Sequence, residues 1–134
     1  MEYEFALTVP AATAAATPFT SELKLARGII RKATVHFPAG SQYLVHVQVY
    51  SQSHQIYPLE EDRDLAYEDY TWETTVPYPL ATEPYRLKVK AWSPSCDYAH
   101  VIRVGIHLEP EAVPSALDRL IELLTKFLRL LGAR

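Results

Sequence analysis

The chain has 134 residues, of which 49% are hydrophobic and 22% charged, and its formal net charge is −3. This length favours a single domain that can bury a core without cross-links, and the even spread of apolar residues excludes extensive disorder. The slightly acidic balance gives no support for a nucleic-acid-binding role, because such proteins are more often basic.

The first ten residues, MEYEFALTVP, begin acidic and contain no unbroken apolar segment. We therefore expect no signal peptide, and no stretch of about 18 apolar residues predicts a membrane-spanning helix. The chain is expected to be made in the cytoplasm. Tyr3, Phe5 and Leu7 alternate with Glu4, Ala6 and Thr8, which predicts a strand that ends at Pro10.

Further strands are predicted through the middle of the chain. Phe19, Leu23 and Leu25 fit a strand, and residues 29–37 follow Gly28 with a register break near Lys32 that predicts a β-bulge. The segment YLVHVQVY, residues 43–50, alternates most clearly, with Val45, Val47 and Val49 on the inward face. The segment SQSHQIYPL, residues 51–59, continues the strand pattern after a short break with Ile56 and Tyr57, and residues 71–76 are expected to form another strand.

The last two predicted strands are the most regular. In residues 84–92, Leu87, Val89 and Ala91 face inward and Arg86, Lys88, Lys90 and Trp92 outward. In residues 98–108 the inward positions are Ile102, Val104, Ile106 and Leu108. About eight short strands separated by turns predict an all-β fold, an antiparallel β-sandwich of the jelly-roll kind, over residues 1–110.

Two loops have more than one interpretation. The segment AATAAATP, residues 11–18, predicts either a loop on the surface or an arm that reaches a neighbouring subunit. The acidic loop of residues 59–69 carries Asp62, Asp64 and Asp69, which could supply oxygens to calcium, but it lacks the EF-hand order and its glycine. We expect a solvated loop there. The single cysteine, Cys96, is expected to be a small loop residue in the segment SPSCD.

Residues 111–134 predict an amphipathic α-helix after a proline-containing hinge. Ser115 is the expected N-cap, Asp118 its N3 partner, and Gly132 the C-terminal stop. Large apolar residues follow at three- and four-residue steps, and Leu123 and Leu130 widen the stripe. We expect seven of them to form an oligomer interface: Leu117, Leu120, Ile121, Leu124, Phe127, Leu128 and Leu131.

An apolar face this wide is expected to be buried against another surface, and three such surfaces are possible. The helix could fold back on its own sandwich, pack with copies of itself, or lie on a membrane. A membrane surface favours a strongly basic polar face, whereas Asp118, Glu122, Lys126 and Arg129 carry both signs, so a membrane is not expected. Packing with copies is the interpretation we favour, because the hinge suits a tail that leaves its domain.

A second contact surface is suggested by basic residues. Arg86, Lys88 and Lys90, together with Arg103, are expected to line an outer sheet face that could dock on an acidic partner, such as the EEDRD loop of a neighbouring copy. A docking of this kind would be heterologous, since two different patches meet. The alternative is an ordinary solvated sheet face.

No pattern of residues indicates catalysis, so an enzyme is not expected, and neither is a cofactor or a metal. Nucleophile-elbow, Walker and dinucleotide motifs are missing from the sequence. His36 and His46 would lie near each other if their strands paired, but a third ligand at zinc spacing is missing. We expect surface positions for these two and for His100 and His107, and a loop position for His54.

Aromatic residues support an alternative function. Trp92 occupies an outward position, and Trp72 and Tyr50 could do so too, which would suit a carbohydrate-binding module of the lectin type. Aromatic side chains in sandwiches, however, also close the ends of the core.

The pattern as a whole, from TVPAATAAATPFTSELKLARGII through VHFPAGSQYLVHVQVYSQSHQIYPL to YPLATEPYRLKVKAW, resembles small β-sandwich virion proteins of tailed bacteriophages. These are capsid decoration or head-associated proteins, and the resemblance covers residues 3–108. It implies a non-enzymatic protein located in the virion, a homo-oligomer and often a trimer, whose partners are itself and a major capsid protein. It assigns no role to individual residues.

Overall fold

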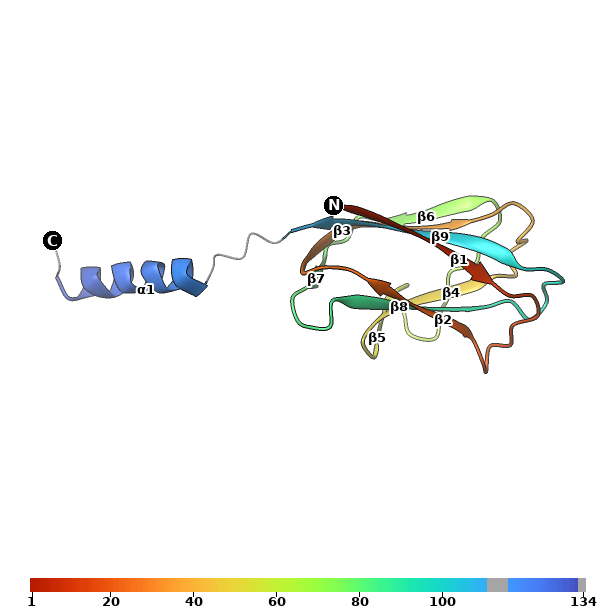
Figure 1. The fold of residues 1–134 in the computed structure, drawn as a ribbon, viewed down its shortest axis with the longest axis horizontal. Coiled ribbons are helices and arrows are strands. Elements are labelled where there is room, and N and C mark those ends of the chain that lie inside the picture. The colour runs from red at the N-terminus through yellow and green to blue at the C-terminus, as the bar shows by residue number, and fades with distance from the viewer. Residues whose placement is uncertain (111–115, 133–134) are drawn as a thin grey trace.

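The computed structural model describes residues 1–110 and 116–132, and of residues 116–119 it describes the backbone alone. Nine strands and one helix follow one another along the chain (Figure 1). Their bounds are β1 Glu2–Val9, β2 Phe19–Lys24, β3 Gly28–Phe37, β4 His46–Ser51, β5 His54–Tyr57, β6 Tyr70–Thr74, β7 Tyr78–Leu80, β8 Arg86–Trp92, β9 His100–Glu109 and α1 Ala116–Leu130.

The strands form two antiparallel sheets. One has the order β1-β9-β3-β6, with β7 also paired to β3, and the other has the order β2-β8-β4-β5. Figure 1 shows the two sheets as layers, with β1, β9, β3 and β6 in one and β8, β2, β4 and β5 in the other. Since β6 and β7 both extend β3 on the same side, they act as one interrupted strand, and the sandwich has the eight-strand order of a jelly roll.

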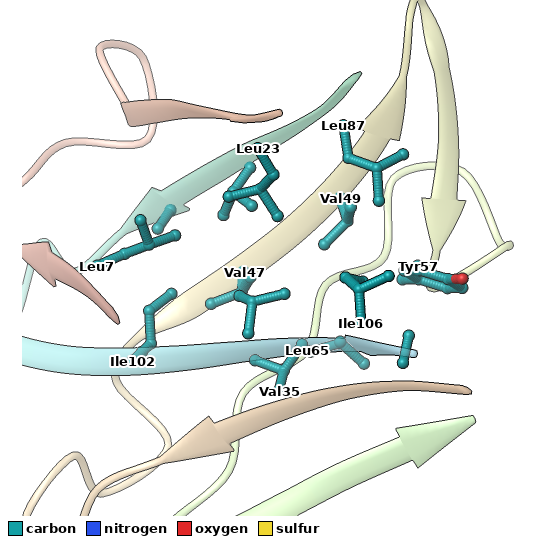
Figure 2. Packing of buried hydrophobic residues seen from close by; sticks show 14 of the residues in the cluster. Leu7, Leu23, Val35, Val47, Val49, Tyr57, Leu65, Leu87, Ile102 and Ile106 are labelled. Carbon is teal, nitrogen blue, oxygen red and sulfur yellow. The ribbon is translucent and has the colours of Figure 1, made fainter. Parts of the chain in front are cut away.

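The side-chain period of two decides which residues enter the core. Val45, Val47 and Val49 are fully buried, as are Leu87, Val89 and Ala91, and the intervening residues of these strands face outward. The inward row of β9 is buried in the same way. Figure 2 shows Leu23, Val47, Leu87, Ile102 and Ile106 meeting between the sheets. The predicted inward faces of these strands are confirmed.

The predicted bulge in β3 is confirmed as well. The pairing of β3 with β9 shifts between Ile30 and Lys32, so that Ile30 and Ala33 both point into the core although three positions separate them. Without the extra residue, the apolar side chains on one half of β3 would face solvent.

Residues 11–18 lie against the sandwich of their own chain. The Ala12 amide donates to the Cys96 carbonyl at 3.0 Å, and the Ser93 amide donates to the Thr13 carbonyl at 2.9 Å. The Ser93 hydroxyl also bonds the Pro10 carbonyl at 2.9 Å. These bonds fasten the segment to the β8–β9 turn, so it is a surface loop, and the arm interpretation is wrong.

Candidate assembly surfaces

The helix α1 follows the β-sandwich and covers neither sheet (Figure 1). Its end is set by Gly132, which has a φ of 75° and donates its amide to the Arg129 carbonyl at 3.1 Å. Glycine adopts this left-handed conformation without the steric cost that a Cβ adds, so the predicted C-terminal stop is confirmed. The predicted N-cap, Ser115, and the side chain of its partner Asp118 lie outside the described residues.

Six of the seven side chains predicted to form the oligomer interface are described, and all six are exposed. Their exposed fractions lie between 50% for Leu124 and 67% for Leu131, and the set consists of Leu120, Ile121, Leu124, Phe127, Leu128 and Leu131. The side chain of Leu117 lies outside the described residues. Leu123 and Leu130 are exposed as well, at 63% and 85%. In this structure the helix therefore does not bury its apolar face against its own sandwich.

The exposed apolar residues repeat with a heptad spacing. Leu120, Leu124, Phe127 and Leu131 are separated by four, three and four positions, which is the spacing of a coiled-coil seam. Ile121 and Leu128 flank this seam on one side, and Leu123 and Leu130 on the other. In two-stranded coiled coils these flanking positions usually carry charged residues, so the apolar surface of α1 is wider than a dimer seam requires.

The structure places the predicted basic residues on two different faces. Arg86, Lys88 and Lys90 project from the outer face of β8, in the four-stranded sheet. Arg103 projects from β9, in the other sheet, where its guanidinium lies 3.4 Å from the Glu4 carboxylate. The prediction that all four line one face is therefore wrong, because consecutive strands β8 and β9 lie in opposite layers.

Two of the three aromatic residues proposed to bind sugars share a face. Trp92 and Tyr50 are half-buried on the outer face of the four-stranded sheet. Trp72 lies opposite Val35 and packs against the core, with its ring centroid 5.6 Å from that of Tyr57. Trp72 therefore faces inward and cannot extend an outer aromatic surface.

The histidines do not come together. His36 and His46 belong to different sheets, so the strand pairing that could have brought them together does not occur. The connection between β3 and β4 crosses from one layer to the other. His36 Nδ1 lies 2.8 Å from the Thr71 hydroxyl, and His46 Nδ1 lies 2.9 Å from the Asp64 carboxylate. Within residues 1–110 and 116–132, no group of three or more potential ligands could hold a metal ion.

His100 is a buried residue, not the surface residue we expected. It is 7% exposed, its ring centroid lies 4.8 Å from that of Tyr98, and neither ring nitrogen has a hydrogen-bond partner among the described residues. The alternation along β9 could have predicted this burial, because His100 lies two residues before buried Ile102 and so on the same, inward face of the strand.

A shallow hollow of about 560 Å³ lies on the outer face of the five-stranded sheet. It surrounds Gly105, where the missing side chain lowers the surface. In the hollow, the Arg103 guanidinium lies 3.4 Å from the Glu4 carboxylate, and the His107 ring lies 3.5 Å from the Glu2 carboxylate. Each of these four side chains already has a partner, so none of them is free to bind a ligand in the hollow.

Comparison with known proteins identifies no relative: the chain matches no family model and no curated protein. Among the described residues, no helix is both long and apolar enough to cross a membrane. Two surfaces, the exposed apolar face of α1 and the outer face of the four-stranded sheet, carry the apolar, aromatic and basic groups described above.

Proposed function

We propose that this protein is a non-enzymatic structural protein that assembles with copies of itself through the apolar face of α1. The observation that carries the proposal is the exposure of eight large apolar side chains, Leu120 to Leu131, on one helix. Monomeric proteins rarely leave so large a contiguous apolar surface in water, and such surfaces mark contacts with other molecules.

The energetics favour burial of this face. Removing the exposed half of each apolar side chain from water contributes about 1 kcal/mol, so the eight side chains contribute on the order of 8 kcal/mol per helix. An isolated helix of 15 residues is only marginally stable in water. Association therefore stabilises the helix and covers the surface at the same time.

The width of the apolar face favours three or more helices over two. Ile121 and Leu128 on one side of the seam, and Leu123 and Leu130 on the other, would stay partly exposed in a two-stranded coil. In a trimer or a larger bundle each helix contacts two neighbours, and both flanks become buried. A homo-trimer is the smallest assembly that satisfies this requirement.

Light scattering on the full chain and on residues 1–110 tests the proposal. All the buried core residues belong to the sandwich, so the shorter chain is expected to fold. We expect an oligomer for the full chain and loss of this oligomer after Leu124→Asp. Thr125→Asp is the matched control, because it adds the same charge one residue away, outside the apolar stripe, and should leave the mass unchanged. Equal masses for Leu124→Asp and the parent would contradict the proposal.

The setting we propose is the virion of a tailed bacteriophage, where the sandwich decorates the capsid and contacts the major capsid protein. The jelly-roll order supports this setting, since viral capsid proteins use the same fold. Antibodies against the sandwich should label capsids at regular intervals in electron micrographs of phage particles that carry the protein. Label found only in the particle-free fraction would refute this role.

A carbohydrate-binding module is the second candidate, and the shared face of Trp92 and Tyr50 favours it. One side of Trp92 is occupied, because the His46 ring stacks on it with centroids 5.6 Å apart and an angle of 8° between the planes. Glycan-array binding that disappears in Trp92→Ala would support this candidate, and a blank array would exclude the glycans tested.

A further inference from the structure

The outer face of the four-stranded sheet carries a basic strip along β8. Lys88 is exposed and forms no ion pair within the described part of the chain. Lys90 Nζ lies 4.5 Å from the centre of the Tyr50 ring, and Arg86 lies 3.0 Å from the Glu22 carboxylate. Glu22 also lies opposite Lys88 in the pairing of β2 with β8, so three basic side chains of the strip share the negative charge of one neighbouring carboxylate. The strip therefore keeps a net positive charge.

An acidic loop, residues 59–64, is fixed to the same sheet on the other side of β4. The backbones of Val47 and Leu65 exchange two hydrogen bonds of 2.9 Å. The Gln55 side-chain amide reaches into the loop and donates to the carbonyl of Arg63 at 2.8 Å. Glu61 and Asp62 are exposed and, among the described residues, have no cationic partner. The loop therefore holds a negative strip in a fixed place.

A half-buried strip of aromatic and amide groups separates the two charges. It runs along β4 and contains Tyr50, whose hydroxyl donates to Gln48 at 2.9 Å, and His46, whose ring stacks on Trp92 at the end of β8. Tyrosine and tryptophan are enriched at the centres of protein–protein interfaces, where charged residues form the rim. The loop is bonded to β4 on the side away from β8, so the face has the order basic, aromatic, acidic from β8 across β4 to the loop.

We propose that two copies of the chain pair through this face, around a two-fold axis that lies in the interface and runs along β4. Such an axis reverses the order of the strips in the second copy. Lys88 and Lys90 of each copy then lie opposite Glu61 and Asp62 of the other, and the aromatic strips meet at the centre. The contact is isologous, because one patch serves both copies, in place of the heterologous docking that the sequence suggested.

The pairing is independent of α1, which contributes no residue to this face. Charge complementarity specifies how the second copy is oriented. A copy whose strips ran in the same order would place like charges opposite each other. Where the helix also associates, the two contacts would join copies through different surfaces and build an assembly larger than either contact alone.

Sedimentation velocity on residues 1–110 tests the pairing without the helix. We expect a concentration-dependent dimer whose dissociation constant rises roughly tenfold between low and high salt, as screening weakens the charge contacts. The pair Lys88→Glu and Lys90→Glu should give a monomer, and so should the pair Glu61→Lys and Asp62→Lys. An equimolar mixture of the two variants should form a heterodimer, since each face then meets its opposite charge.

The matched control carries Lys32→Glu and Arg103→Glu on the other sheet. It changes the net charge by the same amount and should leave the dimer intact. Near-ultraviolet circular dichroism checks that each variant is folded, and Lys88→Gln with Lys90→Gln provides a milder change that should weaken the dimer. The proposal would be overturned if unsubstituted residues 1–110 were monomeric at every concentration in low salt. A dimer that the charge reversals leave unchanged would overturn it as well.

These outcomes separate the two proposals. Failure of the sheet pairing appears in residues 1–110 alone, whereas failure of the helix assembly appears in the full chain carrying Leu124→Asp. A monomer that binds a glycan through Trp92 would also overturn the pairing and would assign the face to a ligand.

Discussion

Gly28 in β3 lies against the backbone carbonyl of Glu109 in β9, so close that a Cβ at position 28 would stand 2.5 Å from that oxygen. The position also touches the Leu108 side chain, at 3.1 Å from the same Cβ. Here the ends of β3 and β9 approach each other at the corner of the five-stranded sheet, and no side chain fits between them. Gly105 offers a contrast, because its Cβ would meet a side-chain atom, the Thr34 hydroxyl, also at 2.5 Å.

Gly28→Ala should therefore destabilise the protein more than Gly105→Ala. A backbone carbonyl in a sheet cannot move away cheaply, and we expect a loss of about 2–3 kcal/mol for Gly28→Ala. The Thr34 hydroxyl can turn to another rotamer, so Gly105→Ala should cost about 1 kcal/mol or less. Urea unfolding measures both losses. Adding Thr34→Ala should recover the loss at position 105, and no recovery would show that the contact is not its cause.

Tyr57→Phe should stabilise the protein at neutral pH and remove part of its alkaline sensitivity. The phenol is buried and its hydroxyl has no hydrogen-bond partner among the described residues, so its removal should gain about 1 kcal/mol. Burial, with a smaller effect of Tyr78, raises the pKa of Tyr57 from 10.0 to about 12.

The direction of the alkaline effect follows from this raised pKa. Below pH 10 the ionisation of Tyr57 does not reduce the free energy of unfolding. As the pH rises from 10 to 12, up to about 3 kcal/mol of this free energy is lost, since Tyr57 ionises in the unfolded chain before it ionises in the folded one. Unfolding measured across this range should show a smaller decline for Tyr57→Phe than for the parent. Tyr43→Phe, at an exposed position, is the control. Equal declines for the parent and Tyr57→Phe would contradict the assignment.

Glu68→Gln should lower stability at neutral pH and have little effect in acid. The carboxylate accepts hydrogen bonds from the backbone amides of Gly40 at 2.8 Å and Gln42 at 2.5 Å, and these bonds lower the pKa of Glu68 below 4.5. The ionised Glu68 therefore adds to the free energy of unfolding above pH 4.5, and this contribution is lost as the pH falls through the lowered pKa. Urea midpoints for both proteins should differ at pH 7 and converge at strongly acidic pH. A difference that persists in acid would show that charge is not the cause.

Cys96 should react slowly with thiol reagents in the folded protein. The residue is 5% exposed, and burial raises the pKa of its thiol, so little thiolate is present near neutral pH. Labelling followed by absorbance should be slow in buffer and fast in denaturant. Fast labelling of the native chain would show that the loop of residues 93–97 opens readily. Cys96→Ser provides the background rate.

Sequence pattern alone predicted which side chains enter the core, because alternation is a local property of a strand. Val45, Val47 and Val49 needed no knowledge of partners, and the shift at Lys32 followed from the spacing of apolar residues in one segment. The same rule could have placed His100 inside, but its polar chemistry argued for the surface. The width of the apolar stripe on the C-terminal helix was equally readable, since it depends on spacing within fifteen residues.

Tertiary structure decided which faces lie together. The turn between β3 and β4 looks the same whether it makes a hairpin or crosses to the other sheet, and only the crossing separates His36 from His46. In the same way, the crossing between β8 and β9 separates Lys88 from Arg103. Likewise, residues 59–64 read as an acidic loop, but Gln55 and Val47 fix that loop beside β4, opposite the basic strip. Periodicity specifies the face a residue occupies within its strand. Pairing between distant strands, which depends on how two complete layers pack, specifies its neighbours.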